Sequence, residues 1–303
     1  VKPIDLFFAA RPMLHLPIWS IYLTALHYHH ELSSERFRPA DLGLLLCLSL
    51  LAAGAYYINQ VYDYHTDLMN KKLGFLQRQF LAQRDMVGAY LVVSLLGLAG
   101  AAFYSWFILI VFLQLFVLGY VYSASPLRLK DRPVWGLLAN AYCIGFLVSV
   151  SIMPDITIHN AGLLGWDNPV YFFLAVAAVY LLTTLPDRDG DRAAGKRTLA
   201  VVLPIVVVKL LTLMCLLTAA YIAFRSERTL LVALALIAAL PVVLTLIINS
   251  VTLVLFAAKL PILLLTLLVS YFFPLYPVFV VVVLIVCRMY YWKRFNLVYP
   301  KLA

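Results

Sequence analysis

Charged residues are scarce in this chain. Asp, Glu, Lys and Arg make up 12% of its 303 residues, whereas a typical soluble domain contains about 25%. Hydrophobic residues make up 64%, against about 45–50% in a soluble domain. So few charges cannot form a solvated surface around so much apolar sequence. The composition therefore excludes an ordinary soluble protein and predicts an integral protein of the lipid bilayer.

Cysteine is also rare, and its positions exclude two kinds of site. No CxxC pair occurs, and each of the four cysteines stands alone in an apolar run: Cys47, Cys143, Cys215 and Cys287. We therefore expect no disulfide framework and no thiolate metal site. The net charge is +9, but the basic residues lie in short segments between apolar runs, so no nucleic-acid partner is expected. Residues 1–19 lack the basic, apolar and small-residue order of a cleaved signal peptide, and none is expected.

Apolar runs of bilayer-spanning length fill most of the chain. A helix needs about 20 apolar residues to cross the hydrocarbon core. Such runs lie at 12–30, 40–62, 86–104, 106–123, 133–152, 168–186, 199–224 and 229–249. A further stretch, 254–292, is interrupted at Phe273-Pro274 and is interpreted as one broken span or two short ones. Because backbone groups in lipid must be satisfied internally, residues 1–303 are predicted to form a single all-α, polytopic membrane domain of nine or ten transmembrane helices.

Lysine and arginine are concentrated in alternate connections between these runs. The basic connections are 63–85, 124–132 and 187–198, and those in between carry fewer basic residues or balance them with acids. Positively charged connections remain on the cytoplasmic side of a membrane. Four predicted spans separate residue 63 from residue 187, so an even number of crossings places both of these connections on one face. We predict that this face is cytoplasmic.

Two of these connections carry acidic residues at a repeated spacing. The stretch NQVYDYHTD at 59–67 places Asn59, Asp63 and Asp67 four residues apart, and LPDRDGDR at 185–192 repeats the interval with Asp187 and Asp191. Residues i and i+4 lie on the same face of a helix. The alternative is two solvated loops that only terminate helices, and it does not explain why one spacing occurs twice on one face.

Carboxylates at this spacing repel each other unless a cation lies between them. Mg²⁺ prefers hard oxygen ligands and is usually bound by one or two carboxylates together with substrate phosphates. The amide of Asn59 can donate to a phosphate oxygen or bind a metal through its carbonyl oxygen. Two acidic pairs beside basic residues therefore predict a diphosphate bound through Mg²⁺.

The stretches NQVYDYHTDLMN, YSASPLRLK and DRDGDRAAGKRTLAV together resemble the UbiA superfamily of intramembrane prenyltransferases. That family has an NxxxDxxxD motif after its second helix and a DxxxD motif after its sixth, and the resemblance covers nearly the whole chain in motif order and span placement. It implies helices around a central cavity, an isoprenyl diphosphate donor and two Mg²⁺ ions that bridge the diphosphate. The ligands it implies are Asn59, Asp63, Asp67, Asp187 and Asp191.

The resemblance also assigns residues that contact the substrate. Tyr122 and Lys130 fall in the family's tyrosine-and-lysine segment, with Arg128 beside them, and the catalytic set is expected to be the four aspartates with Lys130 and Tyr122. Arg78 aligns with a family arginine downstream of the first motif. This chain, however, reads RQFLAQR where many relatives read RPxP, so Lys71 or Lys72 could fill that role instead.

The predicted reaction is transfer of a polyprenyl group from the diphosphate to a lipophilic acceptor, with the hydrocarbon tail held among the membrane helices. An aromatic acceptor, as in quinone biosynthesis, is the preferred reading, and a glycerol-phosphate ether lipid precursor is the alternative within the family. Two readings come from other classes. A secondary transporter usually places its carboxylates near the bilayer midplane, whereas here they lie at span ends. A CDP-alcohol phosphotransferase would carry one extended acidic motif, which the sequence lacks.

Overall fold

The computed structural model describes residues 3–33, 37–69, 74–153 and 166–299, and in these ranges it is helical without strands. The all-α prediction is confirmed. The long helices are α2 (Leu16–Ser33), α3 (Pro39–Tyr62), α5 (Gln83–Ala102), α6 (Trp106–Ser123), α9 (Asp167–Thr184), α12 (Ile205–Arg225), α13 (Thr229–Ile247), α14 (Val251–Phe272) and α15 (Tyr276–Phe295). A further rod consists of α7 (Pro133–Asn140), the π-helical stretch η3 (Ala141–Leu147) and α8 (Val148–Val150). The shorter elements are α1 (Pro3–Ala9), η1 (Pro12–His15), α4 (Tyr64–Met69), η2 (Leu129–Asp131), α10 (Arg188–Ala193) and α11 (Leu199–Val202).

Eight helical segments of the described chain are long and apolar enough to cross a membrane. They are α3, α5, α6, the rod at 133–150, α9, α12, α13 and α14. These match seven of the eight predicted runs and the first part of 254–292. Helix α2 covers most of the predicted run 12–30, but neither it nor α15 is among the eight. A multi-pass helical protein is therefore confirmed, and a count of nine or ten spans stays a prediction.

Proline explains two differences between predicted and observed elements. The run 199–224 is divided, because α11 ends at Val202 and Pro204 precedes α12. The stretch 254–292 forms two full helices, α14 and α15, separated around Phe273-Pro274. Proline lacks an amide hydrogen and clashes with the preceding turn, which favours a break at these two positions, whereas Pro241 and Pro261 are accommodated inside α13 and α14.

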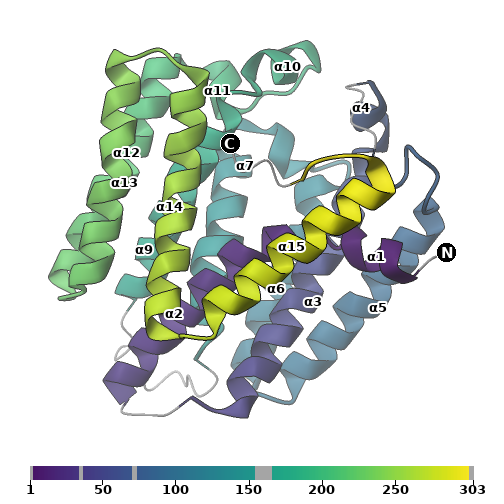
Figure 1. Cartoon of the computed structure of the whole chain (residues 1–303), viewed down its shortest axis with the longest axis horizontal. Helices are drawn as coiled ribbons and strands as arrows, with labels where there is room; N and C mark the ends of the chain where they lie inside the picture. The colour runs from purple at the N-terminus through teal and green to yellow at the C-terminus, as the bar shows by residue number, and fades with distance from the viewer. Residues whose placement is uncertain (1–2, 34–36, 70–73, 154–165, 300–303) are drawn as a thin grey trace.

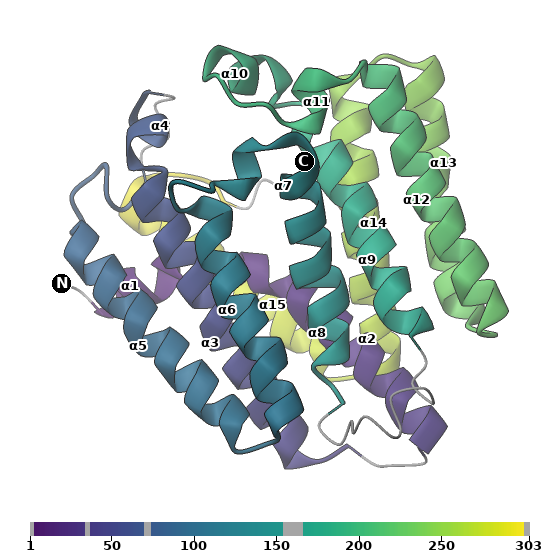
Figure 2. The same cartoon turned by 180° about the vertical axis from the view of Figure 1, so that it is seen from behind.

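The helices form two groups that are joined by the rod at 133–150 (Figures 1 and 2). Helix α3 packs against α5 and α6; on the other side α9 packs against α12, and α13 lies between α12 and α14. The rod at 133–150 joins the two groups, since η3 contacts both α6 and α9. Elements α4, α10 and α11 lie together at the top of both views. We call this the Asp end, because both acidic motifs lie there.

The rod approaches α9 very closely at Gly145 in the π-helical stretch. A Cβ atom at this position would lie 2.6 Å from the Phe172 carbonyl carbon and 2.7 Å from Phe173 Cα. These are backbone atoms, which cannot rotate away as a flexible side chain can. Only glycine therefore allows this approach, and the π-helical stretch is held against α9.

The first and last described helices are joined at their polar groups. Helix α15 crosses the bundle diagonally to reach α1 (Figure 1). There Arg294 donates to both carboxylate oxygens of Asp5, at 3.0 and 2.7 Å, and the Tyr290 hydroxyl donates to the same carboxylate at 2.5 Å. Asp5 is only 1% exposed. A buried carboxylate is thus satisfied by the C-terminal helix.

Candidate active site

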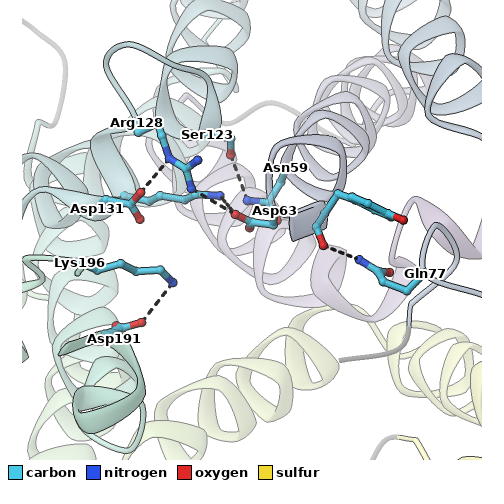
Figure 3. Close-up of polar contacts among 10 residues, drawn as sticks. Asn59, Asp63, Gln77, Ser123, Arg128, Asp131, Asp191 and Lys196 are labelled. Atoms are coloured by element: carbon cyan, nitrogen blue, oxygen red, sulfur yellow. Dashed lines mark hydrogen bonds and ion pairs between the residues drawn. The ribbon is translucent and has the colours of Figure 1, made fainter. Parts of the chain in front are cut away.

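The first acidic motif forms one continuous face at the end of α3. Asn59 lies in the last turn of α3, Asp63 follows that helix, and Asp67 lies in α4. The amide of Asp63 donates to the Asn59 carbonyl at 2.9 Å, and the amide of Asp67 donates to the Asp63 carbonyl at 2.8 Å. Helical bonding therefore continues through the motif, as the four-residue spacing predicts. The Asn59 amide donates to Ser123 Oγ at 3.0 Å, which fixes it beside α6 (Figure 3).

Two cations surround the Asp63 carboxylate. Lys130 Nζ donates to Asp63 Oδ1 at 2.6 Å, and an Arg128 guanidinium nitrogen lies 3.6 Å from the same oxygen. Burial lowers the pKa of Lys130 from its ordinary value, while the charge of Asp63 acts in the opposite direction. The structure thus brings together three residues that are up to 67 positions apart in the chain.

The second acidic motif repeats this arrangement with its own lysine. The amide of Asp191 donates to the Asp187 carbonyl at 2.8 Å, so the two aspartates are one helical turn apart. Lys196 Nζ donates to Asp191 Oδ1 at 3.1 Å. Burial acts to lower the pKa of Lys196, but the nearby carboxylates, Asp191 first and then Asp131 and Asp63, outweigh it and raise the pKa. Carboxylates of both motifs therefore act on the pKa of a single lysine.

Asp131 lies in the connection 124–132 and contacts residues near both motifs. The sequence analysis did not select it. Its Oδ2 accepts from Arg128 Nε at 2.8 Å, and its carbonyl accepts from the Arg197 amide at 3.1 Å. Its Oδ1 is buried and has no hydrogen-bond partner among the described residues. The sequence signal is a carboxylate directly after Lys130, in a connection whose other charged residues are all basic.

These residues fit a divalent cation held jointly with a substrate. In the described part of the chain, no three His, Cys, Asp or Glu side chains converge to form a metal cage by themselves. Instead Asp63 and Asp191, whose side chains are 19% and 15% exposed, each face a lysine ammonium. A carboxylate that already binds a cationic group, with oxygens still accessible, suits Mg²⁺ completed by phosphate and water ligands.

The other predicted substrate-binding residues lie in different places. Tyr122 lies close enough to Tyr180 of α9 and to Asn140 at the end of α7 to interact with both. Arg78 donates to the Phe295 carbonyl at 3.2 Å, and its guanidinium lies 5.0 Å from the Phe295 ring. The structure therefore places Arg78 against α15 rather than beside Asp63. Lys71 and Lys72 lie outside the described residues, and the role given to each of these residues stays a prediction.

A cavity of about 350 Å³ begins at these polar groups. Asn59, Tyr122 and Lys130 line its polar end, and the remaining walls are mostly apolar residues of α3, α6 and the rod. Along α3 the lining runs from Asn59 to Leu48, and these eleven steps of α-helix extend for about 16 Å. We call this space the first chamber. It joins a charged end to an apolar interior, as a prenyl diphosphate requires.

Arg11 also lines the first chamber, and the sequence analysis did not select it. It precedes η1 in a left-handed conformation, with φ of 56°, where the chain turns into the bundle. Its position depends on this turn and on packing far from the acidic motifs. The only sequence signal was a basic residue immediately before an apolar run.

A second cavity, of about 240 Å³, lies beside the first, and we call it the second chamber. The two share four lining residues, namely Ile18, Tyr56, Asn140 and Ile144. The other walls come from α2, α9, α13 and α14. None of the described residues that line it is charged. The interior is therefore divided into one chamber with cations and one without.

Comparison with known proteins places this arrangement in a family. The model of the UbiA prenyltransferase family matches residues 18–260. This chain belongs to the UbiA prenyltransferase family. The prediction drawn from the three motifs is thereby confirmed, and α15 lies beyond the matched residues.

UbiA relatives are known from plants and from archaea. The chain is 30% identical to a probable chloroplastic homogentisate phytyltransferase 2 of Oryza sativa subsp. japonica, over 50% of this chain and 42% of that protein. It is 28% identical to the chloroplastic homogentisate solanesyltransferase of Arabidopsis thaliana, over 61% of this chain and 46% of that one. It is 29% identical to the lycopene elongase/hydratase of Halobacterium salinarum, over 65% of this chain and 70% of that protein. The match spans less than half of the two plant proteins.

Solved UbiA structures share the fold. A UbiA homologue from Archaeoglobus fulgidus, bound to DMAPP and Mg²⁺, has a TM-score of 0.62 at 20% identity and covers 88% of this chain and 99% of its own. A digeranylgeranylglyceryl phosphate synthase has a TM-score of 0.67 at 14% identity, and the match covers 89% of this chain and 97% of that one. At such identities the likeness concerns the arrangement of helices.

Proposed function

We propose that this UbiA-family protein is a Mg²⁺-dependent intramembrane prenyltransferase, which moves a polyprenyl group from an isoprenyl diphosphate to a lipophilic acceptor. The observation that carries the proposal is the pairing of Asp63 with Lys130 and of Asp191 with Lys196 at the polar end of an apolar chamber. The relatives named as prenyltransferases and the homologue bound to DMAPP and Mg²⁺ support it. We further propose that two Mg²⁺ ions bridge the diphosphate and that the Asp end faces the cytoplasm.

The residues of the Asp end have separate tasks in this proposal. Asn59, Asp63, Asp67, Asp187 and Asp191 would hold the metal ions. When bound, Mg²⁺ supplies electrostatic stabilisation of the leaving diphosphate. Lys130 and Arg128 stabilise the same charge with fixed donors that need no reorganisation during the reaction. Tyr122 would border the diphosphate at the polar end of the first chamber.

The reaction requires that water be kept away from an allylic cation. The C1–O bond of the donor breaks, and its electron pair leaves with pyrophosphate. The π electrons of the acceptor then form a bond to C1, and the proton on the attacked carbon passes to the released pyrophosphate. The apolar walls of the first chamber exclude water during this interval. An aromatic acceptor, as in quinone biosynthesis, provides the required π electrons.

The test is pyrophosphate release by the purified protein in lipid. Geranyl, farnesyl and geranylgeranyl diphosphate are supplied with Mg²⁺, each with and without aromatic acceptors and a glycerol-phosphate ether lipid precursor, and products are identified by mass. Mg²⁺-dependent release with a prenylated product is expected. If none of the three donors binds or reacts, the proposed function is wrong. A prenylated ether lipid without any aromatic product would replace the aromatic acceptor with the alternative.

A further inference from the structure

The relative position of the two chambers bears on where the acceptor, the second substrate, would bind. Along α9, the second chamber is lined from Thr183 to Tyr171, and these twelve steps of helix extend for about 18 Å. Thr183 is in the last turn before the second acidic motif, so this chamber also starts near the Asp end. The chambers therefore run side by side from one end of the bundle. The second is not a deeper continuation of the first.

The chambers meet just below the expected position of the diphosphate. Tyr56 lines both chambers and precedes Asn59 by three residues, or about 4.5 Å along the helix. Asn140 lines both as well, and it lies close to Tyr122, which lines the first chamber. A donor whose diphosphate lies at Lys130 would place its C1 atom beside this junction. A molecule in the second chamber would approach C1 there.

The chemistry of the second chamber limits what it can hold. Its polar groups are few, and three hydroxyls among them already donate to backbone carbonyls: Tyr56 to Leu14 at 3.0 Å, Tyr171 to Leu231 at 3.1 Å and Thr183 to Tyr180 at 2.9 Å. A charged group inside would lose its hydration and find no cation among the described lining residues. Diphosphate and phosphate groups are therefore unsuited to it.

We infer that the second chamber is the acceptor site and that its occupant is an uncharged, apolar, π-rich molecule. This inference rests on the proposed function, because it takes the first chamber as the donor site. Its nucleophilic atom would lie at the junction between Tyr56 and Asn140. The acceptor class is thereby narrowed from any lipophilic molecule to a neutral one.

Matched substitutions separate the two chambers. Ala175 of α9 lines only the second chamber, and Ala52 of α3 lines only the first; both are partly buried alanines in helix interiors. Ala175→Phe and Ala52→Phe therefore add the same side chain to one chamber each. Ala175→Leu serves as a smaller filling residue if the phenylalanine variant does not fold. The probes are menadione, a neutral two-ring quinone, and geranylgeranyl diphosphate with Mg²⁺, each measured by equilibrium binding.

Opposite losses are expected from the two variants. Ala175→Phe should weaken menadione binding by at least about tenfold and leave donor binding within about twofold, since filling a pocket discriminates by such factors. Ala52→Phe should do the reverse. Menadione binding to the wild-type protein should be independent of Mg²⁺. Replacing menadione with 1,4-dihydroxy-2-naphthoate, a similar ring system with a carboxylate, should weaken binding by at least about tenfold.

Three results would overturn the inference. They are absence of menadione binding to the wild-type protein, equal or tighter binding of the carboxylate probe, and loss of donor rather than menadione binding in Ala175→Phe. The last result would show that the second chamber holds the donor's tail. In each case intact Mg²⁺-dependent donor binding by the wild-type protein would leave the proposed function standing. Absence of that donor binding would instead remove the proposed function itself.

Discussion

Lys130 Nζ lies 2.6 Å from Asp63 Oδ1, and the lysine side chain is only 10% exposed. The ammonium group thus contacts Asp63, a proposed metal ligand. It also lines the first chamber, which would receive the diphosphate. A single side chain connects the acidic motif to the leaving group.

Replacing Lys130 is therefore expected to impair turnover strongly. Lys130→Met should lower kcat/KM for the donor by about 10²–10³-fold, the loss typical of removing one preorganised donor to a developing charge. Lys130→Arg should retain more activity because it keeps the positive charge. The exposed Lys293 offers a control, since Lys293→Met removes a lysine far along the chain from the motifs. Steady-state kinetics in lipid measures all three, and wild-type kcat/KM in folded Lys130→Met would contradict the role.

The two aspartates paired with lysines should each be indispensable. Asp63→Asn and Asp191→Asn keep side-chain size but remove the charge that would bind Mg²⁺, and each should reduce turnover by about 10³-fold or more. Asp189→Asn is the matched control, because Asp189 lies in the same short helix and its side chain is exposed. Thermal unfolding should show all three variants folded. Similar losses in Asp189→Asn would show that the effect is not specific to the paired positions.

Removal of metal should abolish donor binding without unfolding the protein. The carboxylates of Asp63 and Asp191 each have a lysine partner within the protein, so we expect the fold of the Asp end not to require Mg²⁺. With EDTA, circular dichroism should stay unchanged while geranylgeranyl diphosphate binding is lost. Restoring Mg²⁺ and donor at 100 times Kd should stabilise the fold by about 2.7 kcal/mol. Equal donor affinity with and without EDTA would exclude the proposed metal role.

The close approach at Gly145 predicts two glycine variants with opposite effects. Gly145→Ala should destabilise the protein by about 1–3 kcal/mol, because its Cβ meets the backbone of α9 and must push the two elements apart. Gly88 of α5 has nothing within 4 Å of a Cβ atom, so Gly88→Ala should stabilise by about 0.5–1 kcal/mol through helix propensity. Chemical unfolding in detergent compares them, and a neutral Gly145→Ala would refute the steric explanation.

Replacing Arg294 and replacing Asp5 should destabilise the protein to different extents. Arg294→Met leaves a carboxylate that is 1% exposed without its cation, whereas Asp5→Ala leaves a guanidinium with 28% of its side chain exposed. Unfolding temperature should therefore fall more in Arg294→Met than in Asp5→Ala. The double variant should recover part of the loss. Equal effects of the two single variants would contradict this ordering.

The acidic spacings could be read from the sequence because they depend on local helical geometry. Asn59, Asp63 and Asp67 lie within three helical turns, so their common face follows from the spacing alone. The apolar runs likewise predict helices, since lipid leaves the backbone no other partner. These properties are local, and the family resemblance extends them to the whole chain.

Other parts of the site depend on contacts between distant segments and were not predictable in this way. Arg11 reaches the first chamber through a left-handed turn. Asp131 matters because of Arg128 and Arg197, which approach it from different connections. Arg78 was assigned by alignment, but its position depends on α15, which lies beyond the residues matched by the family model. The division into two chambers requires knowledge of side chains from four or more helices.

The contact between α1 and α15 also has a consequence for how the protein is made. Asp5 and Arg294 are separated by 289 positions, so the ribosome has almost finished the described chain before this carboxylate meets its cation. Until then, burial of Asp5 in the bundle would leave a carboxylate without its cation, which is energetically costly. We therefore expect α1 to stay at the membrane surface until α15 is present. Docking of α1 is therefore among the last steps of biogenesis. A chain cut short before Arg294 would therefore leave Asp5 without its cation.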